Sequence, residues 1–144
     1  MPSALRIAGL FEAAVTTSLS GDSITSIALR LSDPPDEAWV EAFHHEWALT
    51  SYPRKRNARI ATVRVDGALR PGLVLFASPE DYVDKHKRHL EDAVDRANER
   101  VAQRDRRRDR TIAEAARRIR EINEAHYGDG LGPASDRPHV RLAV

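Results

Sequence analysis

Hydrophobic and polar residues alternate along residues 24–31, where Ile27, Leu29 and Leu31 are separated by Ala28 and Arg30. A period of two places every second side chain on one face of a strand. Residues 59–65 alternate in the same way, and residues 73–77 form a continuous apolar run. The pattern therefore predicts three strands, with the last one buried on both faces.

A turn signal joins the second and third predicted strands. Asp66-Gly67 is among the dipeptides that most often form a two-residue β-hairpin turn. Pro71-Gly72 follows within the third strand, where proline is expected only at a sheet edge or in a bulge. The two segments are thus predicted to pair as an antiparallel hairpin.

Between the first two strands, apolar residues recur at helical spacing. Trp39, Phe43 and Trp47 fall on one face of a helix, with both tryptophans of the chain among them. Asp33 is the predicted cap, and Pro34 suits the first helical position.

Residues 4–16 fit two interpretations. Their apolar positions lie near a helical stripe, and alanine is frequent. The Ser20-Gly21-Asp22 turn that follows also fits a strand ending at Ser20 and pairing with the next strand as a hairpin.

The longest predicted element is a helix from Pro79 to residue 127. Ser78 can cap it, Pro79 suits its first position, and Gly128 is a natural stop. No glycine or proline lies between them. Apolar stripes occur before and after a polar segment at residues 104–110. Thr111 begins a capping-box pattern that would allow a fresh helix start, but arginine is a good helix former, which favours one continuous helix.

The order strand, helix, strand, strand, long helix predicts an α+β fold. We expect a small, mostly antiparallel sheet with helices on one face, and a long charged C-terminal helix that either projects or joins a helical dimer. We expect the chain to have three parts, which are an α+β body at residues 1–78, the long helix at 79–127 and a flexible tail at 128–144. The helix should pack on the body in its first half and extend from it in its second.

The composition of the chain limits the classes of function that it can have. The 144 residues carry a formal net charge of +1 and no cysteine, which excludes disulfides and thiolate chemistry. The lack of cysteine fits a cytoplasmic protein, which is the expected location. No apolar window reaches the roughly 20 residues of a membrane span, so we expect no membrane partner. Glycine-rich phosphate loops, dinucleotide fingerprints and nucleophile elbows are absent from the sequence. We therefore predict no cofactor and favour a non-enzymatic protein over an enzyme.

The long helix is the main candidate for an interaction surface. Its apolar stripe is narrow and recurs at separations of three, four and seven residues, as in helices that pack against another helix. The predicted partner is a second copy of the chain, forming a homodimer, or a larger protein. The predicted interface residues are Val94, Ala97, Val101, Ile112, Ala116, Ile119 and Ile122.

Two basic segments suggest nucleic-acid binding as the alternative function. Arginine forms forked hydrogen bonds to phosphate, and Tyr52 beside the first segment could stack on a base. The acidic residues Asp105 and Asp109 within the second segment instead favour a salt-bridged, solvated helix. The candidate residues are Arg54, Lys55, Arg56 and Arg59 in the first segment, and Arg104, Arg106, Arg107, Arg108 and Arg110 in the second.

Histidines suggest a third, less favoured function. His86 and His89 lie three residues apart on the long helix, and His45 lies on the tryptophan-containing helix. If these helices pack side by side, three imidazoles could bind a metal ion in a metal-dependent enzyme. The spacing lacks the pattern of the metalloprotease helix motif, so ordinary surface or half-buried histidines are the more common explanation.

Overall fold

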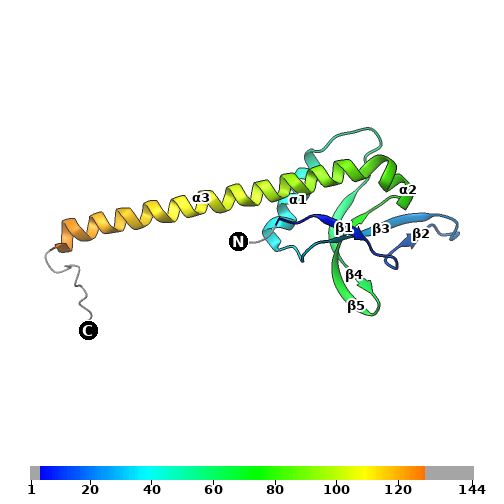
Figure 1. Cartoon of the computed structure of the whole chain (residues 1–144), viewed down its shortest axis with the longest axis horizontal. Helices are drawn as coiled ribbons and strands as arrows, with labels where there is room; N and C mark the ends of the chain where they lie inside the picture. Colours follow the sequence, from blue (N-terminus) through cyan, green and yellow to red (C-terminus); the bar gives the residue numbers. More distant parts are fainter. Residues whose placement is uncertain (1–3, 129–144) are drawn as a thin grey trace. The chain divides into compact units, whose positions relative to one another are not determined.

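The computed structural model describes residues 4–128 (Figure 1). They belong to two compact units, the first ending at Ala102 and the second beginning at Gln103. The predicted C-terminal tail lies, apart from Gly128, outside the described residues.

The first unit contains an antiparallel sheet whose strands follow the order β1-β3-β5-β4, with β2 also paired to β3. This arrangement confirms the predicted α+β fold and all three predicted strands. The strands are β1 (Ile7–Leu10), β2 (Thr16–Thr17), β3 (Ile24–Leu31), β4 (Ala58–Val65) and β5 (Ala68–Leu75).

The helical interpretation of residues 4–16 is wrong, and the strand alternative is nearer to the structure. β1 pairs along one part of β3, and β2 pairs with it through Thr16 and Thr17. The amide of Phe11 also donates to the carbonyl of Ala28 at 2.9 Å. Pairing to an available strand satisfies the backbone groups of this segment, and such tertiary pairing outweighs a weak helical preference.

The helix α1 (Glu37–Leu49) carries the predicted aromatic stripe but begins later than predicted. Its cap is Asp36, whose Oδ1 accepts from the amide of Trp39 at 2.8 Å. A proline disfavours helical geometry at the residue before it, so Pro35 prevents Pro34 from starting the helix. Phe43 is fully buried and stacks on both tryptophans, with ring centroids 5.6 and 6.3 Å apart.

The β4–β5 hairpin forms as predicted. Asp66 and Gly67 both have positive φ, at 52° and 80°, which suits a primed hairpin turn. Pro71 pairs opposite Thr62 without a register shift, so there is no bulge. β3 pairs only with residues 73–75 of β5, which leaves Pro71 on an open edge where its missing amide hydrogen costs no ladder bond.

The long helical segment begins with α2 (Pro79–Asp81), followed by the π-helical turn η1 (Tyr82–His86) and α3 (Lys87–Tyr127). Ser78 caps it as predicted, accepting from the amide of Asp81 at 3.2 Å. α3 continues through residues 104–110, so a fresh start at Thr111 is wrong. The Thr111 hydroxyl instead donates to the carbonyl of Arg107 within the helix, at 3.0 Å.

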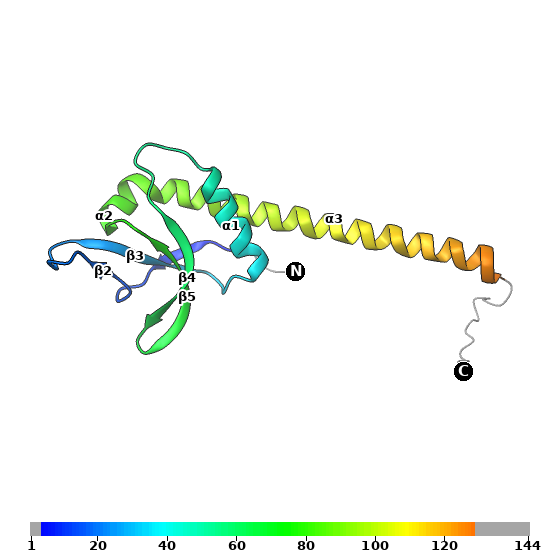
Figure 2. The same ribbon diagram turned by 180° about the vertical axis from the view of Figure 1, so that it is seen from behind.

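The core of the first unit lies between the sheet and two helical segments. Figures 1 and 2 show α1 and the first turns of α3 on the same side of the sheet. From α3, Leu90, Ala93, Val94 and Ala97 enter this core with exposed fractions of 1% or less. The sheet contributes Ile27, Leu29, Leu31, Ala58, Leu73 and Leu75.

Candidate functional site

The predicted interface residues fall into two groups. Val94 and Ala97 are buried in the first unit, and Val101 is half-buried against its core. These three residues stabilise the fold of their own chain. The later residues, in the second unit, are accessible to a partner.

The second unit has an exposed apolar stripe on its part of α3. Ile112 and Ile119 are each 59% exposed and Ile122 is 41% exposed, while Ala116 is also exposed. At about 100° per residue these four positions share one side of a helix. We call Ile112, Ala116, Ile119 and Ile122 the isoleucine stripe.

Asn98 was not predicted to matter, although it interrupts the apolar stripe of the long helix. Its Oδ1 accepts from the Trp39 indole at 2.8 Å and from the Leu5 amide at 3.0 Å. Its Nδ2 donates to the carbonyl of Leu5 at 2.8 Å. A polar residue within an otherwise apolar stripe was the available signal. Asn98 connects α3, α1 and the start of the chain.

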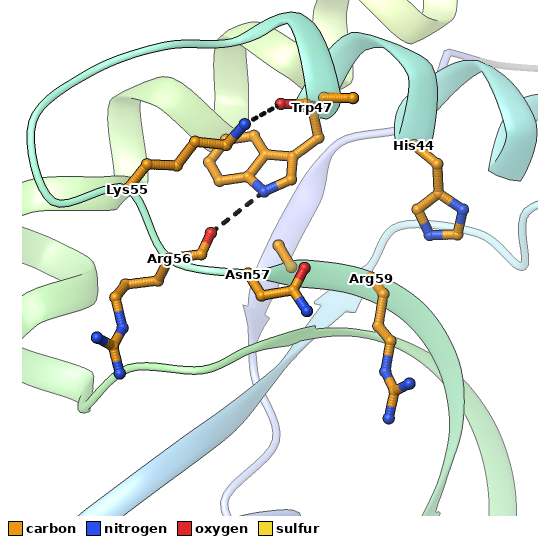
Figure 3. Close-up of a pocket in the computed structure, with 8 residues that line it drawn as sticks. His44, Trp47, Lys55, Arg56, Asn57 and Arg59 are labelled. Carbon is orange, nitrogen blue, oxygen red and sulfur yellow. Dashed lines mark hydrogen bonds between the residues drawn. The ribbon is translucent and has the colours of Figure 1, made fainter.

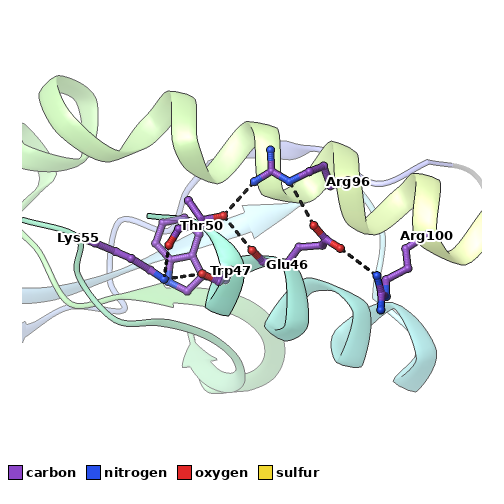
Figure 4. A network of polar contacts seen from close by, with 6 residues as sticks. All are labelled: Glu46, Trp47, Thr50, Lys55, Arg96 and Arg100. Atoms are coloured by element: carbon purple, nitrogen blue, oxygen red, sulfur yellow. Dashed lines mark hydrogen bonds and ion pairs between the residues drawn. The ribbon is translucent and has the colours of Figure 1, made fainter. Parts of the chain in front are cut away.

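Glu46 makes a second polar connection between α1 and α3 (Figure 4). Only 9% exposed, it pairs with Arg96 and Arg100, each at 3.2 Å. Arg96 also donates to the Thr50 hydroxyl at 2.9 Å. A buried carboxylate needs such partners, so both arginines are used in the fold.

The first basic segment is held by contacts within the protein. The Lys55 ammonium donates to the carbonyls of Trp47 and Thr50 at the end of α1. Cations in this position satisfy carbonyls that have no partner within the helix. Arg54 has a φ of 63°, so the chain turns there through left-handed geometry. Lys55 thus has a structural role, and its ammonium is not a free phosphate ligand.

Arg56 and Arg59 both contact Phe76, by different means. Nε of Arg56 donates to the Phe76 carbonyl at 2.9 Å. The Arg59 guanidinium lies 5.7 Å from the centroid of the Phe76 ring. One residue therefore orients two guanidinium groups that remain exposed.

The second basic segment is an exposed part of α3. All five of its predicted arginines are exposed, and Arg108 pairs with Asp105 at 3.5 Å. This contact is one of the intrahelical ion pairs that the acidic residues in the segment indicate. Binding of nucleic acid by either basic segment stays a prediction.

The structure brings two of the three predicted metal ligands together. The Tyr52 hydroxyl lies 2.7 Å from Nδ1 of His86, and the Tyr52 ring stacks on His89 with centroids 3.8 Å apart. His45 is exposed on α1. Across residues 4–128, no group of three histidine or acidic side chains is arranged to hold a metal ion.

The contact between Tyr52 and His86 joins two groups that are both uncharged at neutral pH. Burial raises the pKa of Tyr52 to about 12, so the phenol keeps its proton. Burial also lowers the pKa of His86, so the imidazole is neutral. The contact is therefore a hydrogen bond between a neutral phenol and a neutral imidazole, in which the tautomer of His86 decides which atom donates. The π-helical turn η1, which sequence patterns did not predict, places His86 in this position.

A surface pocket of about 480 Å³ opens beside the end of α1 and the start of β4 (Figure 3). His44 lies at one end of it, where its Nε2 accepts from the amide of Ile60 at 3.0 Å. Burial lowers the pKa of His44, which favours the neutral imidazole. A neutral imidazole has one unprotonated nitrogen, as the hydrogen bond accepted by Nε2 requires. The pocket is lined by His44, Trp47, Ala48, Lys55, Arg56, Asn57, Ala58 and Arg59.

Comparisons with protein family models, with curated proteins and with solved structures find no match. Among residues 4–128, no helix has the length and apolar character needed to cross a membrane. The function must therefore be argued from the isoleucine stripe and the pocket themselves.

Proposed function

We propose that this chain is a non-enzymatic interaction module that self-associates through the isoleucine stripe of α3. The observation that carries the proposal is the exposure of Ile112, Ile119 and Ile122 on one side of a helix. Exposed apolar side chains that cluster in this way are typical of interaction surfaces.

The spacing of the stripe suits a two-stranded helical interface. Ile112 and Ile119 are seven residues apart and occupy equivalent positions of a heptad, with Ala115 and Ile122 at the second core position. β-branched residues at the first position favour two-stranded packing. A stripe of this kind is self-complementary, so a two-fold homodimer is its simplest closed assembly.

The expected homodimer is weak. Fully burying an isoleucine contributes roughly 1.5–3 kcal/mol, and these side chains already have part of their surface covered. Association costs an estimated 4–15 kcal/mol, which is comparable to the gain from six half-exposed isoleucines. Monomer and dimer should therefore exchange with concentration, and a larger protein partner would bind more tightly by adding contacts.

Light scattering coupled to size exclusion tests the proposal. We expect the average mass to rise from monomer towards dimer between about 10 μM and 1 mM, the range in which weak complexes form. High salt should preserve the dimer because the contact is apolar. Ile119→Asp should abolish the rise. Ala113→Asp, which places the same charge about 100° round the helix from Ile112, should not. A monomer throughout this range would contradict self-association.

A further inference from the structure

We propose that the pocket beside the start of β4 binds a small molecule that bears an oxyanion. The oxyanion is either a carboxylate or a phosphate monoester. The site is separate from the isoleucine stripe and does not depend on self-association. Its volume of about 480 Å³ lies in the range of small-ligand sites.

The charge of the pocket lining selects for an anion. Lys55, Arg56 and Arg59 contribute three cations, and the eight lining residues include no carboxylate. The Lys55 ammonium is already used at the end of α1. Within residues 4–128, neither the Arg56 nor the Arg59 guanidinium pairs with an acidic side chain, so both remain available to bind an anion.

The two guanidinium groups are held in place before any ligand arrives. Phe76 anchors Arg56 through its carbonyl and Arg59 through its ring. Figure 3 shows the two side chains extending away from Trp47 on either side of Asn57, with their guanidinium groups at separate points of the pocket lining, so each offers its own contact to an anion. The Phe76 carbonyl uses only Nε of Arg56, so the terminal nitrogens can still donate. Side chains that are already ordered lose less entropy on binding, and a guanidinium fork matches the oxygens of carboxylate and phosphate.

His44 adds a neutral donor to the same pocket. Because its Nε2 accepts from the Ile60 amide, its proton lies on Nδ1. The Asn57 amide is a further lining donor, although its carbonyl can also accept. Ala48, Ala58 and Trp47 contribute apolar lining for the rest of the ligand. A single pocket of about 480 Å³ favours a small molecule over a nucleic-acid strand, which needs a groove that follows several phosphates.

The two tryptophans provide an internal probe and an internal reference. The Trp47 indole lines the pocket and donates to the carbonyl of Arg56 at 3.3 Å. The Trp39 indole donates instead to Asn98 within the core. In ¹H–¹⁵N spectra at constant ionic strength, phenyl phosphate should shift the Trp47 indole signal saturably and leave the Trp39 signal unchanged. Inorganic phosphate and benzoate, titrated separately, distinguish a preference for phosphate from one for carboxylate.

Substitutions provide the control. The double variant Arg56→Gln, Arg59→Gln should weaken phenyl phosphate binding at least tenfold, whereas Arg64→Gln removes a β4 cation outside the pocket and should leave it unchanged. An unshifted Trp39 signal verifies the fold. If the double variant does not fold, Arg59→Lys keeps the charge but loses the fork, and it should still weaken binding.

Three outcomes would overturn the anion site. The first is no saturable Trp47 shift with phenyl phosphate, inorganic phosphate or benzoate. The second is an equal response in Arg64→Gln and the double variant. The third is a Trp47 shift produced only by a single-stranded oligonucleotide, which would identify the pocket as part of a nucleic-acid surface.

Discussion

The indole of Trp39 donates a 2.8 Å hydrogen bond to Oδ1 of Asn98, a residue 59 positions further along the chain. The same side chain accepts from the Leu5 amide and donates to the Leu5 carbonyl. One side-chain amide thus joins three segments that are remote in sequence. Its oxygen meets two donors and its nitrogen meets one acceptor.

Asn98→Ala should lower the free energy of unfolding by about 2–4 kcal/mol, because three hydrogen bonds are lost and their partners in the buried Trp39 and Leu5 are left without them. Urea unfolding followed by circular dichroism measures this change. Asn123→Ala makes the same substitution at an exposed position of α3 and should change stability by no more than about 0.5 kcal/mol. Equal effects at the two positions would show that the Asn98 bonds add nothing.

The second prediction concerns the contribution of the Glu46 carboxylate charge to stability. The Glu46 side chain is largely buried, while Arg96 and Arg100 are about half exposed, so solvent weakens each pair. Glu46→Gln should cost about 1–2 kcal/mol in low salt and less in high salt. Glu91→Gln breaks the exposed pair with Lys87 and should cost below about 0.5 kcal/mol. A loss at Glu46 that does not change with salt would argue against an electrostatic contribution.

Stability should fall as the pH is lowered through the range of histidine titration. Burial lowers the pKa of His44 and of His86 below the usual 6.5. The unfolded chain then binds more protons than the folded chain between the folded pKa and 6.5, so the free energy of unfolding decreases with falling pH. The stabilisation is present above about pH 6.5 and is lost below it.

Charged neighbours modify the effect at His86. Asp81 raises the pKa of His86, whereas Lys85, Arg56 and His89 lower it, and burial outweighs them all. The same sign therefore holds for both histidines. His44→Gln removes one titrating group and should make the pH dependence shallower than in the parent protein. Chemical denaturation of the parent protein and of the variant at pH 7.5 and pH 5 measures the dependence of stability on pH. A parent protein that is more stable at pH 5 would contradict the prediction.

The sequence predicted the elements whose signals are local. Alternation identified β3 and β4, Asp66-Gly67 identified the β4–β5 hairpin, and Ser78 identified the start of the long helical segment. Each of these signals depends on residues within a few positions of one another.

The sequence did not predict features that depend on distant partners. Residues 7–10 form a strand because β3 offers an edge, and their own pattern does not require it. The π-helical turn at residues 82–86, which carries the buried Tyr82 and His86, was not predicted, because residues four apart also share one face of an ordinary α-helix. The pocket likewise depends on Phe76 orienting two arginines 17 and 20 residues before it. Charge clusters marked the arginines, but only the fold separates a structural Lys55 from two available guanidinium groups.

The orientation of the proposed dimer can be determined because the chain contains no cysteine. In a parallel, in-register dimer each Ile119 faces its counterpart, so Ile119→Cys should form an intermolecular disulfide under mild oxidation. Ala113→Cys lies away from the stripe and should cross-link much more slowly at the same concentration. Non-reducing electrophoresis over a time course measures both rates.

An antiparallel dimer gives a different pattern of cross-links. Heptad core positions of opposite type then face each other, so Ile119→Cys alone should stay unlinked, and an equimolar mixture of Ala115→Cys and Ile119→Cys should link as a heterodimer. Either pattern would support self-association through the isoleucine stripe and fix its direction. Equal, slow cross-linking in all variants would mean that two copies do not meet at this face, and a different protein would have to cover it.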